Sequence, residues 1–353
     1  MRLFKSREIV GVDIGTSSVK LVELKESSKG FQLENFAVGP IPSQAIVDGA
    51  IMDAGAIVES LQGLIREYKI KRRQAAMGLS GHSVIVKKIS LPQMSEEELE
   101  ESIHWEAEQY IPFDIDDVNL DFQILDSMGT SEEGKMDVLL VAVKKDKIDD
   151  YTSVLIQAGL NPVIVDLDAF ALQNAYEINY EIVPDKNVAL VNVGAGIMNI
   201  NVMRNGISTF TRDISGGGNQ YTEAIQQELH VSLEDAERLK MSEVLPEVDV
   251  SAVKGIVGSV NENLAVEIQR SFDFFRATST DQEIDTIILS GGCARIAGLD
   301  QFLKERLGVE VEVNNPFQNI QVSEKKFDLQ YISESAPLAA VGIGLALRKA
   351  GDR

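Results

Sequence analysis

Two stretches of the chain repeat one pattern: an apolar, β-branched run, a glycine-centred turn and a second apolar run. They are Val10–Leu24 (VGVDIGTSSVKLVEL) and Val188–Met203 (VALVNVGAGIMNINVM), and their residues correspond at a constant offset of 179. Each stretch predicts a β-hairpin, and an internal pair of such hairpins is much more specific than one alone. Two facing hairpins can clamp a polyphosphate from both sides.

The first turn carries the groups that a phosphate needs. Gly15 lets a ligand approach closely, and successive backbone N–H groups in such a turn can form an anion-binding nest. Further donors are three hydroxyls and one ammonium, those of Thr16, Ser17, Ser18 and Lys20. Asp13 can hold Mg²⁺ through water, because Mg²⁺ prefers a carboxylate with retained waters and phosphate oxygens. Taken alone, the stretch fits an ordinary polar turn with a solvated lysine equally well.

Two more glycine-rich segments each precede a helix. Ser290–Gly298 leads into a helix at 299–307, and its bare backbone can let a flat base and ribose approach. Asp213–Gly218 leads into a helix at 219–229, and the helix after that one carries Glu237 and Lys240. The spacing of this pair is i,i+3, which by itself supports a surface ion pair.

The rest of the second half predicts mainly helix. Residues 241–255 predict a loop with a short amphipathic piece, and a long helix follows at 257–277. Gly342 and Gly344 in a last helix at 336–349 indicate close packing, so this helix is expected in the core. Its apolar run of 12 residues is too short to span a bilayer.

Residues 81–159 look like an insertion into the α/β pattern. Strands are predicted at 84–91, 120–125 and 138–143, with a helix to about Tyr110 after the first strand and a helix at 147–158 after the last. Ser95 and Glu98 form a capping box at the start of the first helix. Trp105 and Tyr110 of that helix either pack the core of the module or form a partner surface.

Composition excludes several classes of protein. The net charge of −22 argues against a general nucleic-acid binder or an adsorber to anionic membranes. The one cysteine, Cys293, rules out an internal disulfide, and three scattered histidines make a zinc site unexpected. The start of the chain shows no signal peptide, so a cytoplasmic protein is expected.

The three glycine turns together resemble the phosphate-1, phosphate-2 and adenosine motifs of the actin-like ATPase superfamily, in its FtsA/PilM branch. The likeness covers essentially the whole chain. It includes DISGGGNQYTEAI (213–225) with SLEDAERLK (232–240), as in FtsA, and EEELEESIHWEAEQYIPFDIDDV (96–118), as in PilM. The resemblance implies a two-lobed α/β fold of duplicated RNase H-like domains, with an inserted subdomain of the FtsA 1C type.

The resemblance also implies the cofactors ATP and Mg²⁺ and a role for each site residue. Asp13 would lie near Mg²⁺, and the β- and γ-phosphates would be held by Gly15, Thr16, Ser17, Ser18 and Lys20. The second phosphate turn would be closed by Gly194, Ala195 and Gly196, with Gly217 and Gly218 near the ribose and phosphates. The nucleoside pocket would be lined by Glu237, Lys240, Gly291, Gly292 and Arg295.

One position departs from the superfamily pattern. Actin-like ATPases commonly have an acidic residue in the second hairpin, where this chain has Asn192. A neutral amide cannot act as a general base and is a weaker ligand for Mg²⁺-bound water. Positioning and charge stabilisation dominate phosphoryl transfer, so we expect tight ATP–Mg²⁺ binding with at most slow turnover, below about 1 per second.

The resemblance further implies subdomain boundaries. Subdomain 1A would be 1–80 with 160–184, and 1C would be 81–159. Subdomain 2A would be 185–212 with 284–353, and 2B would be 213–283. Lys69–Arg73 is a basic spot that either ends a helix in solvent or serves a partner, and Cys293 is expected to pack beside the nucleotide rather than act as a nucleophile.

For a PilM-like chain, the resemblance implies a scaffold in the type IV pilus inner-membrane complex. The short cytoplasmic N-terminal segment of PilN would bind in a groove between 1A and 1C, and the chain would reach the membrane only through partners. Pilus motor ATPases and self-association are further expected contacts. The alternatives are an FtsA-like filament former and a small-molecule kinase on the same fold. Asn192 and the inserted module disfavour the kinase.

Overall fold

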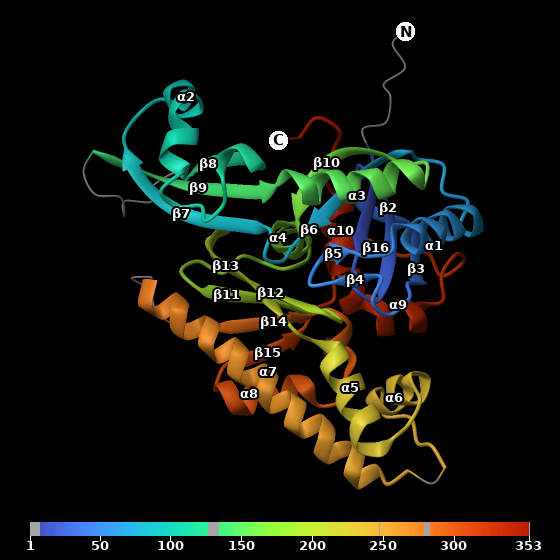
Figure 1. Ribbon diagram of the computed structural model, residues 1–353. Helices are drawn as coiled ribbons and strands as arrows, with labels where there is room; N and C mark the ends of the chain where they lie inside the picture. The colour runs from blue at the N-terminus through green and yellow to red at the C-terminus, as the bar shows by residue number, and fades with distance from the viewer. Residues whose placement is uncertain (1–7, 126–133, 247, 279–282, 353) are drawn as a thin grey trace.

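Two mixed sheets, one in each lobe, form the centre of the fold in the computed structural model (Figure 1). The structure describes residues 8–125, 134–246, 248–278 and 283–352; most of the segment searched for a signal peptide, residues 1–7, lies outside them. The first sheet has the order β10-β6-β1-β2-β3-β16. Its strands are β1 (Val10–Ile14), β2 (Ser18–Ser27), β3 (Gly30–Pro40), β6 (Gln74–Leu79), β10 (Asn161–Leu167) and β16 (Ile320–Gln321).

The second sheet repeats this arrangement. Its order is β13-β12-β11-β14-β15. Its strands are β11 (Asn187–Val193), β12 (Ile197–Arg204), β13 (Ile207–Ser215), β14 (Thr286–Ser290) and β15 (Glu310–Val313). In each sheet, three consecutive strands pair antiparallel: β1, β2 and β3 in the first sheet, and β11, β12 and β13 in the second. Two parallel strands continue each sheet beyond β1 or β11: β6 and β10 in the first, and β14 and β15 in the second. The expected duplicated, two-lobed α/β fold is confirmed.

The hairpin registers match residue by residue. Asp13 pairs across β1 and β2 with Lys20, and Asn192 pairs across β11 and β12 with Asn199. The offset of 179 found in the sequence is therefore a true structural equivalence of the two turns.

Two helices cross between the sheets. These are α4 (Asp168–Asn179) and α10 (Ala340–Ala346), the latter continuing a 3₁₀ turn at Ala336–Ala339. A Cβ on Gly344 would run into the carbonyl oxygen of Ala171, so only glycine allows the helices to approach this closely, as expected. The last helix ends at Ala346, not at Lys349 as predicted, because Lys349 forms a bridge to the backbone of Glu8.

The inserted module has its own sheet and core. The sheet has the strand order β7 (Val84–Pro92), β9 (Lys135–Lys144), β8 (Val118–Leu125). Between β7 and β8 the chain forms α2 (Glu96–Ala107) and then a short 3₁₀ turn at Ile115–Asp117. Apolar side chains fill the space between the sheet and the helix. The capping box forms as predicted, but the helix ends three residues earlier than expected. The following helix, α3 (Lys145–Gln157), packs on α1 (Ala54–Glu67) in the core of the first lobe. We therefore propose that the module ends near residue 144 rather than 159.

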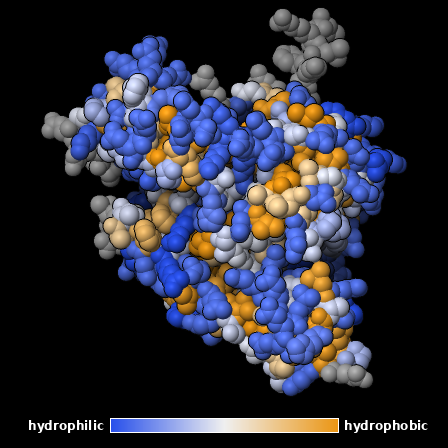
Figure 2. Space-filling model, viewed as in Figure 1, coloured by the Kyte–Doolittle hydropathy of each residue, from blue (hydrophilic) through white to orange (hydrophobic). Residues whose placement is uncertain are grey.

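Helices on the second lobe complete the fold. They are α5 (Gly218–Leu229), α6 (Leu233–Lys240), α7 (Val250–Thr278) and α8 (Leu299–Leu307). Helix α7 begins at Val250, seven residues before the predicted start, because Val253 and Ile256 pack against α5 and α6. The sequence analysis also missed β4 (Ile46–Val47), β5 (Ala50–Ile51) and α9 (Leu329–Ser335). In the described ranges, no helix is long and apolar enough to cross a bilayer, and hydrophilic side chains cover most of the module (Figure 2).

Candidate nucleotide-binding site

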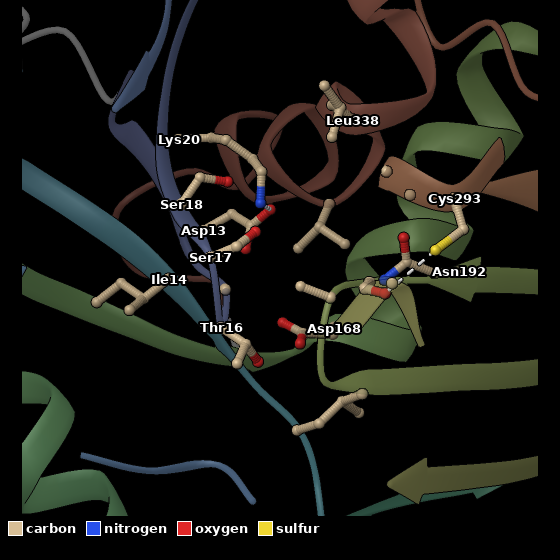
Figure 3. Close-up of a pocket in the computed structure, with 18 of the residues that line it drawn as sticks. Asp13, Ile14, Thr16, Ser17, Ser18, Lys20, Asp168, Asn192, Cys293 and Leu338 are labelled. Carbon is tan, nitrogen blue, oxygen red and sulfur yellow. Dashed lines mark hydrogen bonds and ion pairs between the residues drawn. The ribbon is translucent and has the colours of Figure 1, made fainter. Parts of the chain in front are cut away.

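A cavity of about 320 Å³ lies between the two lobes, with walls from both hairpins (Figure 3). Most of the site residues expected from the sequence line it. They are Asp13, Gly15, Thr16, Ser17, Ser18, Lys20, Gly194, Ala195, Gly218, Glu237, Lys240, Gly291, Gly292 and Arg295. Gly196 and Gly217 do not line the cavity.

The first hairpin presents a buried ion pair. Lys20 Nζ lies 3.1 Å from Asp13 Oδ2, and both residues are less than a tenth exposed. The turn itself is closed by a 3.0 Å hydrogen bond from Gly15 N–H to the carbonyl oxygen of Ser18. The ammonium thus faces the cavity with a single carboxylate beside it, in a position to exchange that contact for a phosphate oxygen.

The second hairpin turn is tied to the start of α5. The N–H of Gly218 donates to the carbonyl of Gly194 at 2.9 Å. Gly217 has φ of +152°, and a Cβ there would strike the same carbonyl. A Cβ on Gly196 would lie 2.8 Å from Thr16 Oγ1, so the turns of the two lobes touch. Gly196 and Gly217 therefore shape the site without facing the cavity.

The opposite wall is built by the third glycine turn and α6. Gly291 has φ of +89°, and a Cβ on it would lie 2.8 Å from Asn192 Oδ1. Glu237 and Lys240 form the ion pair that their spacing supports, at 2.6 Å, yet Lys240 is largely buried and donates to Thr222 Oγ1 at 3.0 Å. Glu237 is half exposed at the cavity rim. Each lobe therefore supplies cationic side chains to the site: Lys20 from the first lobe, and Lys240 and Arg295 from the second.

Asp168 is a cavity residue that the sequence analysis missed. It is the first residue of α4, and its carboxyl points into the cavity (Figure 3). Burial raises its pKa from 3.8 to about 7; the charge of Asp13 adds to the rise, while a hydrogen bond with Ser80 and the charge of Lys147 act against it. The sequence signal that could have identified Asp168 is an acidic residue at the junction of a buried strand and a helix.

Lys147 of α3 was also missed. Its Nζ donates to the carbonyl oxygen of Gly49 at 2.8 Å, and Tyr151 OH donates to the same oxygen at 3.1 Å. Burial lowers the pKa of Lys147, and the charges of Asp168 and Asp213 partly offset this. Because Gly49 lines the cavity, α3 fixes the β4–β5 turn that forms part of the wall.

Two other residues singled out in the sequence, Cys293 and Arg72, are held by contacts within the fold. Cys293 is buried on the cavity wall with its Sγ 3.5 Å from the carbonyl oxygen of Gly194, and burial raises its pKa to about 12, so it is packed and unreactive as expected. Arg72 donates to the carbonyl of Leu24 and pairs with Glu8 and Glu23, so the basic spot is partly tied into the first sheet.

The two aromatic residues expected on this helix differ, and Tyr110 lies just after the end of α2. Tyr110 packs against the core of the module, whereas Trp105 is 75% exposed. The packing interpretation is therefore wrong for Trp105, because the helix turns that side chain toward solvent while Leu99 and Ile103 face the sheet.

A second cavity, of about 250 Å³, lies where the module meets both lobes. It is walled by the start of β7, the end of β13 and the start of α4. Strands β7 and β13 are the outer strands of their sheets and lie beside each other here (Figure 1).

Comparisons with known proteins agree with this geometry. A solved structure described as a "PilM-PilN type IV pilus biogenesis complex" matches with a TM-score of 0.86 and 30% identity, over 98% of this chain and 99% of that chain. The MreB5 of Spiroplasma citri bound to ADP matches in fold alone, with a TM-score of 0.54 and 12% identity over 96% of this chain and 94% of that chain.

Among curated proteins, the cell division protein FtsA of Bacillus subtilis (strain 168) is 26% identical over 255 residues. The match covers 65% of this chain and 57% of FtsA, so the chain spans little more than half of that relative. The family model for the type IV pilus assembly protein PilM matches residues 11–350. With its duplicated sheets, its cleft and the module inserted between β6 and β10, the chain belongs to the PilM family of type IV pilus assembly proteins, on the actin-like ATPase fold.

Proposed function

We propose that the chain acts in type IV pilus assembly as an ATP-binding scaffold whose nucleotide state governs a contact with PilN. The observation that carries the nucleotide part is the cavity between the lobes, where two equivalent turns face each other and each lobe supplies a cation. A ligand that contacts both lobes has different affinities for their open and closed arrangements, which is what a nucleotide-dependent switch requires.

The residues present fit ATP with Mg²⁺. Backbone N–H groups of the Gly15 turn and the ammonium of Lys20 suit the β- and γ-phosphates, and Gly291 leaves room for the nucleoside. Among the described residues, no cluster of three or more acidic, His or Cys side chains could hold a metal. Mg²⁺ would therefore depend on phosphate oxygens and water, with Asp13 accepting from that water. The ion would supply charge neutralisation between the phosphates.

We propose slow turnover. Asn192 has no basic function, and a buried acid of the cavity, Asp168, is partly protonated near neutral pH. Asp168 does supply the carboxylate in the cleft that a small-molecule kinase would need. That alternative is therefore tested together with hydrolysis below.

For the partner, we propose that the N-terminal segment of PilN enters the second cavity, where the module meets both lobes. The matched complex contains a PilN bound to a PilM. Outer strands β7 and β13 offer backbone groups, and Val84, Val86 and Leu167 supply apolar wall. An extended segment gains affinity from main-chain contacts and specificity from such pockets. Contact with motor ATPases, self-association and a place at the membrane through partners remain part of this proposal.

Nucleotide binding is tested with Lys20→Met and a matched control, Lys25→Met, on the solvent side of the same strand. Loss of one charge-assisted contact, at about 1.5–3 kcal/mol, predicts at least a tenfold weaker ATP affinity for Lys20→Met alone. Mass analysis of co-purified nucleotide and calorimetry with ATP–Mg²⁺ give the readout. Equal ATP affinity of the two variants would refute the site.

The function alternatives need separate readouts. A synthetic PilN N-terminal peptide should be retained by the chain, with a different affinity when ATP is present. A brisk steady-state ATPase would contradict slow turnover, and phosphate transfer to a small acceptor without peptide binding would favour the kinase. ATP-dependent sedimentation of filaments would favour the FtsA-like alternative.

A further inference from the structure

A line of hydrogen bonds runs from the second cavity to the nucleotide cavity. Gly81 N–H donates to Asp213 Oδ2 at 2.5 Å, and Asn199 Nδ2 donates to Asp213 Oδ1 at 2.8 Å. Asn192 Nδ2 then donates to Asn199 Oδ1 at 2.9 Å. Gly81 and Asp213 line the second cavity, whereas Asn199 and Asn192 line the first. One continuous polar path therefore touches both cavities.

The path has a fixed direction. An ionised carboxylate can only accept hydrogen bonds, so Asp213 obliges Asn199 to turn its NH₂ group toward it. The amide oxygen of Asn199 then faces residue 192, which has to be a donor. Asparagine satisfies this requirement, whereas an ionised aspartate at 192 would set oxygen against oxygen. The neutral residue that departs from the superfamily pattern is thus the residue that this path needs.

The path is also costly to break. Asn199 is 2% exposed, and a buried polar group left without a partner costs about 1–3 kcal/mol. Desolvation raises the pKa of Asp213, while the bonds from Asn199 and Gly81 and the nearby charges of Lys147 and His82 favour its ionised form. A buried network of this kind holds one arrangement.

The path crosses the boundary between the lobes. Gly81 lies between β6 and β7, at the point where the chain enters the inserted module, and the other three residues belong to the second lobe. A Cβ on Gly81 would lie 3.4 Å from Ile197 Cδ1, next to the second phosphate turn. Displacing the module from the second lobe would therefore separate Gly81 from Asp213.

We propose that Asn192, Asn199 and Asp213 form a directional relay that couples the phosphate end of the nucleotide site to the entry strand of the module. These three residues position the second hairpin and the Gly81 backbone relative to each other; none is assigned a catalytic step. The inference rests on the proposed nucleotide site. A nucleotide that orders Asn192 strengthens the bond at Gly81, and an occupant of the second cavity acts back on the nucleotide by the same amount.

Hydrogen exchange of residues 81–87 tests the coupling on the full chain. Saturating ATP–Mg²⁺ is expected to slow exchange there at least threefold in the unmodified chain. The same slowing is expected in Asn187→Ala, which removes a buried asparagine at the far end of β11. In Asn199→Ala the slowing is expected to vanish at an ATP–Mg²⁺ concentration that calorimetry shows to saturate this variant. Slowing that persists in Asn199→Ala would overturn the relay, and no nucleotide binding in the unmodified chain would overturn the proposed function with it.

A double-variant cycle tests the direction without any ligand. Asp213→Asn creates a third amide, so the amides at 213, 199 and 192 can donate in the opposite direction along the path. The loss of Tm in this variant is therefore expected to be small. Asn192→Asp alone sets two oxygens together and is expected to lower Tm by at least about 3 °C. Asn192→Asp combined with Asp213→Asn restores donor–acceptor matching, so at least half of that loss should return. Losses that simply add in the double variant would refute the relay.

Discussion

Asp168→Asn gives a pH-dependent change in stability whose size follows from the structure. Burial and the charge of Asp13 raise the pKa of this carboxyl from 3.8 to about 7. The folded chain therefore holds a proton that the unfolded chain releases between these values. The free energy of unfolding consequently falls as pH rises through this range, and the loss is complete above the folded pKa. Asparagine carries no such proton, so the variant escapes the loss.

The magnitude comes from about 1.4 kcal/mol per pKa unit, which gives about 4 kcal/mol for the fully ionised group. About 2 kcal/mol of this develops between pH 5.5 and 8.5. With an unfolding entropy of about 2 cal/mol/K per residue, a chain of 353 residues loses about 0.7 kcal/mol of stability per degree near Tm. The Tm of the unmodified chain should therefore fall by about 3 °C relative to the Tm of Asp168→Asn over this range.

The assay is thermal unfolding of nucleotide-free protein in EDTA, followed by circular dichroism at half-unit pH intervals. Asp185→Asn is the control for the loss of a carboxylate at an exposed site, since its side chain is 77% exposed. A pH-independent difference for Asp168→Asn would refute the reasoning that burial holds this carboxyl protonated.

Two other predictions concern single positions. Gly291→Ala should lower the free energy of unfolding by at least about 2 kcal/mol more than Gly298→Ala, as measured by denaturant unfolding. Both glycines have positive φ, but only a Cβ at 291 meets other atoms, those of Val193 and Asn192. Equal losses would mean that backbone strain alone explains both. Trp105→Ala should leave Tm within about 1 °C and remove the intrinsic tryptophan fluorescence, since Trp105 is exposed and is the one tryptophan of the chain. A clear loss of Tm would place this side chain in the folding core.

Local pattern was sufficient for much of the fold. The apolar runs around Gly15 and Gly194, the capping box at Ser95 and the offset of 179 are read from the chain itself, and each appears where predicted. The boundary of α7 was missed because Val253 and Ile256 continue the helix only through contacts with α5 and α6. The sequence left the place of Trp105 open because periodicity alone did not show which face of α2 would meet the sheet.

The candidate site divides in the same way. The sequence by itself determined the two hairpin turns and the third glycine turn, because glycine, hydroxyl and lysine side chains at fixed spacing are local signals. Only the tertiary structure brought Asp168 into the cavity and joined Asn192 to Asp213 through Asn199. The pKa of a carboxyl and the direction of a hydrogen bond depend on burial and on partners from distant segments, which only the packed lobes bring together.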